Sequence, residues 1–264
     1  MDLGLRDKVA IVLAASKGLG RASAAALAGE GAKVVIGSRD GQVLGETAQR
    51  IQRESGSRVL AVPTDVMKPE DLEAIVTAAV REFGHVDVLV NNAGGPPPGK
   101  FEAFGDEQWM SAFELNLLSA VRLIRLVLPE MRKRGEGRII NIVSTSVKQP
   151  IDGLLLSNAI RTGVVGMAKT LSVELAPDNI TVNNVCPGRI LTDRIRQNYR
   201  MREKLQQGVS EEEALKEVVQ DIPMKRIGKP EELGALVAFL ASQQASYITG
   251  TTIQVDGGLT RSLL

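Results

Sequence analysis

Runs of apolar and β-branched residues alternate along the chain with longer segments that mix apolar and polar positions. Seven of these runs are predominantly apolar, and they lie at residues 9–15, 33–38, 58–65, 86–92, 138–144, 180–187 and 251–255. A strand that is apolar at successive positions is covered on both faces, which is the usual arrangement in a parallel sheet. The pattern therefore predicts a buried sheet of parallel strands.

The segments between these runs carry helix signals. Residues 18–31 are rich in alanine and end in Gly31, which is a typical helix stop. Residues 69–84 begin with a proline and two acidic residues, and residues 106–135 end in a basic turn. Alternation of strands and helices at this spacing predicts right-handed βαβ units. We expect an α/β, doubly wound Rossmann fold: a seven-stranded parallel sheet with helices on both faces.

The chain shows no candidate boundary between domains. The stretch GGPPPG at 94–99 is too short for a linker and reads as a loop. We therefore expect one domain over residues 1–264. The segment 193–226 is highly charged and helical in character, and it falls between two recognisable elements. It is interpreted as an insertion that forms a lid over the substrate.

Composition narrows the class of protein. The net charge of +1 favours neither nucleic acid nor an anionic membrane surface as a partner. The single cysteine excludes an intramolecular disulfide and fits a reducing compartment. The N-terminus lacks a signal-peptide pattern, and no apolar run approaches the ~20 residues that span a bilayer. The expectation is a cytoplasmic protein that acts on a small molecule and has no metal site.

A turn with two glycines joins the first predicted strand to the first predicted helix. In VAIVLAASKGLGRA, Gly18 and Gly20 would let the backbone approach a pyrophosphate, and the helix N-terminus would offer unpaired N–H groups. Ala14 stands where a first glycine is expected. The alternative is an ordinary strand–helix turn.

Further motifs lie at the carboxyl ends of predicted strands, where open α/β sheets bind ligands. They are Thr64-Asp65-Val66, Asn91-Asn92-Ala93-Gly94 and Pro187-Gly188. With the glycine turn and the ending PEELGALVAFLAS…ASYITGTTIQVDGG, they make the whole chain resemble the short-chain dehydrogenase/reductase family. The resemblance is to members such as β-ketoacyl-acyl carrier protein reductases and glucose dehydrogenases.

The resemblance implies which residues bind a nicotinamide cofactor. Asp65 and Val66 would contact the adenine, and Asn92, Ala93 and Gly94 would line the cofactor cleft. The residues implied at the phosphate turn are Ala14, Ser16, Lys17, Gly18, Leu19 and Gly20. The residues implied at the nicotinamide end are Pro187, Gly188, Ile190 and Thr192.

The tip of the second strand indicates which nicotinamide cofactor is bound. An acidic residue there would accept hydrogen bonds from the ribose 2′-hydroxyl of NAD, whereas this chain has Ser38 and Arg39. The fork of an arginine suits a phosphate, and Lys17 adds a second cation. These residues favour NADP, although Asp40 follows directly and NAD stays possible.

The resemblance also implies a catalytic set with one gap. Family members use an asparagine, a serine, a tyrosine that donates the proton and a lysine that lowers the pKa of this tyrosine. Asn116 and Ser144 match the first two. At the family's spacing, thirteen residues beyond Ser144, the tyrosine position holds Ser157, and the lysine position holds Arg161. The stretch VVGMAKTLSVELAP that follows keeps the alignment free of gaps.

The two replacements change the expected chemistry. A serine hydroxyl is shorter and far less acidic than a tyrosine, whose reference pKa is ~10. An arginine stays protonated and cannot shuttle a proton, although its guanidinium would still hold the cofactor ribose. Because a general acid contributes ~10²- to 10⁴-fold, ordinary carbonyl reduction should be slower by about that factor.

Several interpretations stay open from the sequence. The chain is either a divergent oxidoreductase that transfers a hydride between NADP(H) and a carbonyl or alcohol, or a catalytically silent nucleotide-binding homologue. A dehydratase or isomerase is a third possibility. Lys148 and Tyr199 are alternative proton donors, although a surface position is the simpler interpretation of each. The resemblance implies a homo-oligomer, a tetramer or a dimer.

Overall fold

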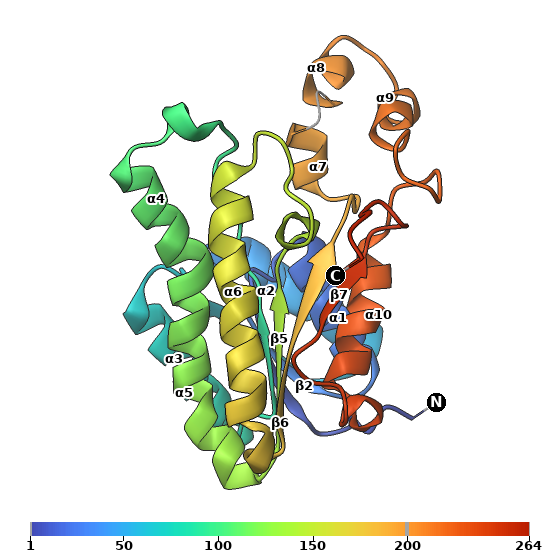
Figure 1. The fold of residues 1–264 in the computed structure, drawn as a ribbon. Coiled ribbons are helices and arrows are strands. Elements are labelled where there is room, and N and C mark those ends of the chain that lie inside the picture. Colours follow the sequence, from blue (N-terminus) through green and yellow to red (C-terminus); the bar gives the residue numbers. More distant parts are fainter. Residues whose placement is uncertain (1, 199–200, 264) are drawn as a thin grey trace.

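A twisted parallel sheet forms the centre of the computed structural model, which describes residues 2–198 and 201–263 (Figure 1). The sheet has seven strands in the order β3-β2-β1-β4-β5-β6-β7. The strands are β1 (Val9–Leu13), β2 (Lys33–Ser38), β3 (Val59–Pro63), β4 (Val88–Asn91), β5 (Gly137–Ile142), β6 (Ile180–Pro187) and β7 (Thr252–Val255). The order reverses between β1 and β4, so the crevice at their carboxyl ends is the place where such sheets bind ligands.

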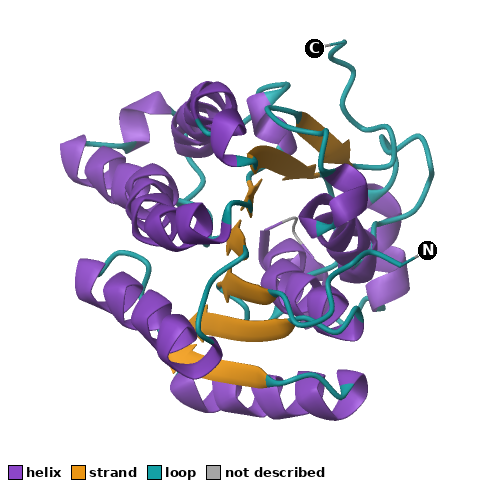
Figure 2. Ribbon diagram, turned by 90° about the horizontal axis from the view of Figure 1, so that it is seen from below, coloured by secondary structure: helices purple, strands orange, loops and turns teal. Residues whose placement is uncertain are grey.

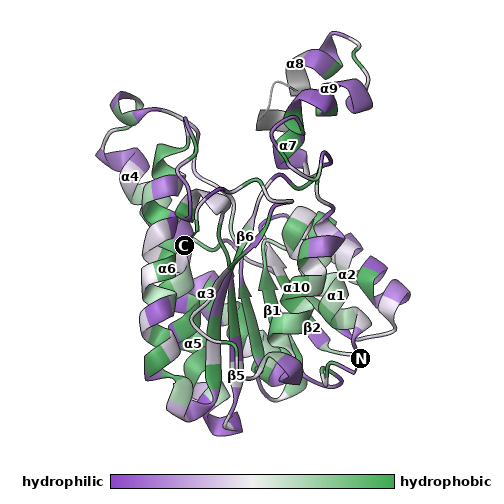
Figure 3. Ribbon diagram, turned by 45° about the vertical axis from the view of Figure 1, so that its right-hand side comes forward, coloured by the Kyte–Doolittle hydropathy of each residue, from purple (hydrophilic) through white to green (hydrophobic). Residues whose placement is uncertain are grey.

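Helices cover both faces of the sheet (Figure 2). One core cluster joins the sheet to α1 (Gly18–Gly29), α2 (Gly41–Ser55) and α10 (Pro230–Ala241). The other joins it to α3 (Pro69–Phe83), α5 (Ser119–Arg134) and α6 (Leu155–Glu174). Apolar residues gather on the strands and on the inner faces of these helices (Figure 3). The predicted doubly wound α/β fold with seven parallel strands is confirmed.

The segment 106–135 is not one regular helix. It divides into α4 (Asp106–Phe113), a π-helical stretch η2 (Glu114–Leu118) and α5. A π-turn widens a helix locally and is frequently found at functional sites. Here it presents Asn116 from the middle of the segment.

Short elements complete the fold. The 3₁₀ turns are η1 (Phe101–Ala103), η3 (Thr145–Val147), η4 (Ala176–Asp178) and η5 (Gln243–Ala245). The charged segment 193–226 contains α7 (Asp193–Asn198), α8 (Met201–Gln206) and α9 (Glu211–Val218). These three helices stand beyond the carboxyl edge of the sheet (Figure 1). None of the helices in the described ranges combines the length and apolar character that a membrane span needs.

A network of charged side chains lies at the opposite, amino-terminal edge of the sheet. The buried carboxylate of Asp87 accepts the N–H of Val9 at 2.8 Å and lies 2.9 Å from Nε2 of His85. Lys8 and Arg134 approach the same carboxylate. His85 therefore lies far from the carboxyl ends of the strands, and its neighbours give it a structural role.

Candidate active site

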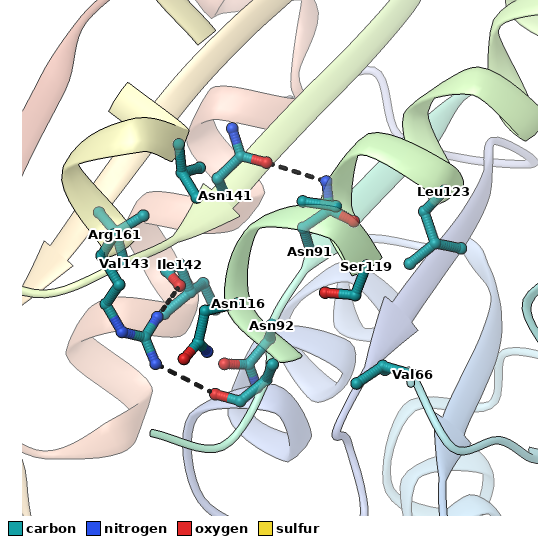
Figure 4. A pocket seen from close by; sticks show the side chains of 13 residues that line it. Val66, Asn91, Asn92, Asn116, Ser119, Leu123, Asn141, Ile142, Val143 and Arg161 are labelled. Atoms are coloured by element: carbon teal, nitrogen blue, oxygen red, sulfur yellow. Dashed lines mark hydrogen bonds between the residues drawn. The ribbon is translucent and has the colours of Figure 1, made fainter. Parts of the chain in front are cut away.

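A pocket opens at the carboxyl ends of β4 and β5, next to the point where the strand order reverses (Figure 4). It encloses about 350 Å³, part of which is open to solvent. Five residues predicted for the site line it together: Val66, Asn92, Ala93, Asn116 and Arg161. The other lining residues are Asn91, Ser119, Ala120, Leu123, Asn141, Ile142, Val143 and Val164.

The turn between β1 and α1 has the geometry of a phosphate cradle. A Cβ on Gly20 would overlap the carbonyl group of Ala14, so only glycine lets α1 begin this close to β1. Gly18 has a φ of +58°, which favours glycine. Leu19 and Gly20 lie in the first turn of α1, where N–H groups have no partner within the helix. The turn therefore offers N–H donors to an anion at the ligand-binding edge of the sheet.

Ala14 takes a backbone conformation that favours glycine. Its φ is +48°, in the left-handed region, where a Cβ costs roughly 1–2 kcal/mol. We expect Ala14→Gly to raise the free energy of unfolding by about 0.5–1 kcal/mol. The reason is that relief of the backbone strain at position 14 outweighs the extra conformational entropy that glycine gives the unfolded chain. In a thermal unfolding experiment the melting temperature should rise by about 1 to 4 °C. The control Ala15→Gly, at a position without a positive φ, should lower the melting temperature instead, and equal effects of both changes would contradict the account.

The tip of β2 holds the residues that the sequence assigned to the adenosine end. The hydroxyl of Ser38 donates to that of Ser16 at 3.0 Å, which ties the strand to the phosphate turn. Arg39 is exposed at the edge. The carboxylate of Asp40 accepts the N–H of Val43 at 3.1 Å and caps α2. Asp40 thus caps the helix that follows the tip of β2.

Asp65 and Val66 follow β3 in a turn. The N–H of Asp65 donates to the carboxylate of Asp71 at 2.8 Å, and its own carboxylate accepts the N–H of Met67 at 3.1 Å. These bonds fix the backbone at the position that the resemblance assigns to the adenine contact, where Val66 lines the pocket.

Asn116 joins the π-turn to the loop after β4. Its Nδ2 donates to the carbonyl of Gly94 at 2.8 Å, while its buried Oδ1 accepts no hydrogen bond from the described residues. A buried amide oxygen without a donor is costly, so this atom marks a place for a water or a ligand donor.

Arg161 lies beneath the pocket and binds backbone carbonyls from two loops. Its Nη1 donates to the carbonyl of Ile142 at 3.3 Å (Figure 4). Its Nη2 donates to the carbonyls of Gly94 at 3.2 Å and Ala93 at 3.5 Å. Burial lowers the pKa of the guanidinium to about 10, and the nearby charge of Arg194 contributes to the shift. At neutral pH the group stays charged, so a fixed cation lies between the ends of β4 and β5.

The hydroxyl of Ser157 bonds within the protein. Its Oγ lies 3.3 Å from Oγ of Ser146, and both residues are buried. The N–H of Ser146 donates to Oγ of Ser144 at 3.1 Å. The predicted Ser144 and Ser157 are thus brought together through Ser146, which the sequence analysis missed. The only signal was its place two residues after Ser144.

Buried asparagines form a ladder across the sheet beside the pocket. Asn91 Nδ2 donates to Asn141 at 2.9 Å, Asn141 Nδ2 to Asn184 at 3.0 Å, and Asn184 Nδ2 to Thr252 at 3.1 Å. Such a chain of bonds stiffens the strand ends that carry the site. The sequence signal was a polar residue at equivalent positions of three otherwise apolar strands.

The segment after β6 crosses from the phosphate turn to the loop after β4. A Cβ on Gly188 would overlap Asp256, and buried Ile190 pairs with Gly228. Farther along, Thr192 lies against Gly18, and Asp193 forms a 3.4 Å ion pair with Lys17. The segment that follows Pro187 thereby lies against the phosphate turn, and its place at the nicotinamide end stays a prediction.

The cysteine, the lysine and the tyrosines that could supply another reactive group lie in different environments. Cys186 is fully buried, and burial raises the pKa of its thiol to about 12, so it is an inert packing residue. Lys148 is half-buried and close enough to lower that pKa in part. Tyr247 is fully exposed. Tyr199 lies outside the described residues.

Comparisons with known proteins find relatives that match nearly the whole chain. A family model described as enoyl-(acyl carrier protein) reductase matches residues 13–260. Dehydrogenase/reductase SDR family member 4 of Homo sapiens is 38% identical over 255 residues, covering 96% of this chain and 88% of the relative. The 3-oxoacyl-acyl carrier protein reductase FabG of Vibrio cholerae is 38% identical, covering 97% and 99%. L-sorbose reductase from Gluconobacter frateurii, solved with NADPH and L-sorbose, has a TM-score of 0.94 and 37% identity, covering 100% of both chains.

Proposed function

The chain belongs to the short-chain dehydrogenase/reductase family, and we propose that it transfers a hydride between NADP(H) and a carbonyl or alcohol substrate. The observation that carries the proposal is the phosphate cradle, where Gly20 lies directly on Ala14. The cradle opens at the same strand ends as the pocket around Asn116 and Arg161. The similarity to a reductase solved with NADPH supports the choice of cofactor.

The residues present fit a dinucleotide. The close approach of α1 to β1 at Gly20 brings the N–H groups of the first helical turn to the ligand-binding edge, and the buried Oδ1 of Asn116 lacks a donor among the described residues. We expect the turn residues to hold the phosphates, Asp65 and Val66 the adenine, and Thr192 the nicotinamide end. When bound, NADPH supplies the hydride.

Arg39 is the residue that we expect to select NADP, through charge-assisted hydrogen bonds to the 2′-phosphate. The variant Arg39→Gln should weaken NADPH binding by about 10-fold, since an exposed bond of this kind is worth about 1.5 kcal/mol. NADH binding should change little. The measurement is a fluorescence titration of both cofactors, with Arg53→Gln, an exposed position on α2, as the matched control. An equal loss for NADH and NADPH would rule out this role for Arg39.

The chain's own residues then hold the substrate oxygen rather than protonate it. Ser144 donates a hydrogen bond to that oxygen. Arg161 contributes a positive charge beneath the site and keeps the loops at Gly94 and Ile142 in place. Ser157 is bonded to Ser146 and supports the turn. We assign no proton donor to position 157, and the proton reaches the product from water.

The silent homologue is the second candidate. One observation favours it: the groups at positions 157 and 161 already bond to Ser146 and to backbone carbonyls. Measurement of NADPH oxidation with a broad panel of ketones, β-ketoacyl thioesters and sugars separates the two candidate functions. Turnover of any member supports the oxidoreductase, whereas tight NADPH binding without turnover supports the silent homologue.

Three expectations from the sequence stay predictions. They are the lid role of residues 193–226 within a single domain, assembly into a homo-oligomer, and a cytoplasmic location. The ion pair between Lys17 and Asp193 supports the first, because it joins the phosphate turn to the start of α7.

A further inference from the structure

An ion pair joins the phosphate turn to the first residue of α7. Lys17, which precedes the first residue of α1, lies 3.4 Å from the carboxylate of Asp193. The neighbouring Thr192 packs beside the same turn, since a Cβ on Gly18 would lie 3.4 Å from the methyl group of this threonine. A carboxylate of the protein thus lies beside the cation of the turn that we expect to bind phosphates.

The segment around Asp193 reaches from the phosphate turn to the loop that follows β4. The next side chain along the segment, that of Arg194, donates to the carbonyl of Pro96 in this loop at 3.4 Å. At its base the segment is held by the backbone, where the N–H of Leu191 donates to the carbonyl of Gly228 at 2.9 Å. The ion pair is therefore a contact that the segment makes across the strand ends where we expect the cofactor.

The ion pair is weak enough to be exchanged. The side chain of Lys17 is 67% exposed and that of Asp193 is 51% exposed. An exposed ion pair contributes little, because water and salt screen it and both side chains lose freedom in it. A phosphate group offers several charged acceptor oxygens to the same ammonium group, so it is the stronger partner. A carboxylate left beside that phosphate would be repelled by it.

We propose that Asp193 competes with the phosphates of NADP(H) for Lys17 and thereby sets the affinity of the protein for its cofactor. When the cofactor binds, Lys17 exchanges Asp193 for a phosphate, and the start of α7 loses its ion pair with the phosphate turn. Lys17 follows Ser16, which bonds to Ser38 at the tip of β2, so the pyrophosphate and the 2′-phosphate are both within the region that the lysine serves. This assignment rests on the proposed binding of NADP(H).

The variant Asp193→Asn tests the competition, because it keeps the size of the side chain and removes its charge. In isothermal titration it should bind NADPH about 3- to 10-fold more tightly than the wild-type protein, since both the competing ion pair and the repulsion are removed. The control Glu212→Gln removes a charge from an exposed position on α9 and should change the affinity less than about twofold. NADH, titrated in parallel, should gain equally if Lys17 meets the pyrophosphate, and little if it meets the 2′-phosphate.

Two further measurements tie the gain to Lys17. In protein that already carries Lys17→Met, adding Asp193→Asn should change the NADPH affinity less than about twofold, because the pair no longer exists. Amide hydrogen exchange at the start of α7 should be faster in ligand-free Asp193→Asn than in ligand-free wild type. Bound NADPH should abolish this difference, because the cofactor breaks the ion pair in the wild-type protein as well.

The results that would overturn the proposal differ from those that would overturn hydride transfer. Asp193→Asn protein that binds NADPH no more tightly than wild type would refute the competition, and so would a gain that persists in the Lys17→Met background. A gain in affinity without turnover of any carbonyl substrate would support the exchange and refute the enzyme. If neither wild type nor Asp193→Asn bound NADPH, the cofactor assignment would be wrong, and the proposal with it.

Discussion

The double variant Ser157→Tyr with Arg161→Lys is expected to reduce simple ketones with NADPH about 10²- to 10⁴-fold faster than the wild-type protein. This is the range that a positioned general acid contributes. A tyrosine at 157 would bring an acidic hydroxyl to the substrate oxygen held by Ser144. A lysine at 161 would lower its pKa through a nearby positive charge. The measurement is kcat/KM for neutral ketones as a function of pH, and the variant should show an ionisation that the wild-type profile lacks.

The control variants separate the effect of the acidic hydroxyl from the effect of the added ring volume. Ser157→Phe with Arg161→Lys supplies the same ring without the hydroxyl, and it should show no gain. The lysine alone should also fail to raise the rate, because Ser157 stays bonded to Ser146. If the phenylalanine variant were as active as the tyrosine variant, the missing acid would not explain the slow reaction. A double variant no faster than wild type would place the limitation elsewhere in the site.

Gly20→Ala is expected to weaken NADPH binding by about 100-fold or more. The added methyl group would overlap the carbonyl carbon and oxygen of Ala14 and the Cα of Ala15, all of them backbone atoms that cannot rotate away. The first turn of α1 must then shift from β1, and its N–H groups lose their alignment with the phosphates. Loss of two charge-assisted hydrogen bonds at about 1.5–3 kcal/mol each accounts for this factor.

The same helix provides the control. A Cβ at Gly29 meets no atom within 4 Å, so Gly29→Ala should leave NADPH affinity unchanged and raise the melting temperature slightly. Isothermal titration and thermal unfolding of both variants give the comparison. If Gly20→Ala bound NADPH as tightly as Gly29→Ala, the turn would not be the phosphate site.

The fold was predictable because its signals are local. Continuous apolar runs gave all seven strands to within a few residues at each end, and Gly31 and Gly84, both with positive φ, lie at the ends of α1 and α3 as expected. The π-turn at Glu114–Leu118 was not predictable, since the periodicity of the segment reads as one helix and the wider turn depends on packing around Asn116.

The site was predictable where a motif lies at a strand end and less so where contacts join distant segments. Asn116 and Arg161 converge on Gly94 because the π-turn, α6 and β4 meet there, and motif spacing indicated both residues. The partner Ser146 was missed as a site residue. Arg194 lies in a charged stretch that reads as a solvated helix, and only the folded chain shows its guanidinium against Gly95.

The most direct test of the account is to follow deuterium from the nicotinamide C4 of labelled NADPH in the wild-type protein. A panel of ketones, β-ketoacyl thioesters and sugars serves as acceptors, and the products are analysed by mass spectrometry. The account predicts an alcohol product that carries one deuterium, formed by a protein that has neither tyrosine nor lysine at positions 157 and 161. A protein that binds NADPH tightly but transfers no label to any carbonyl acceptor would contradict it.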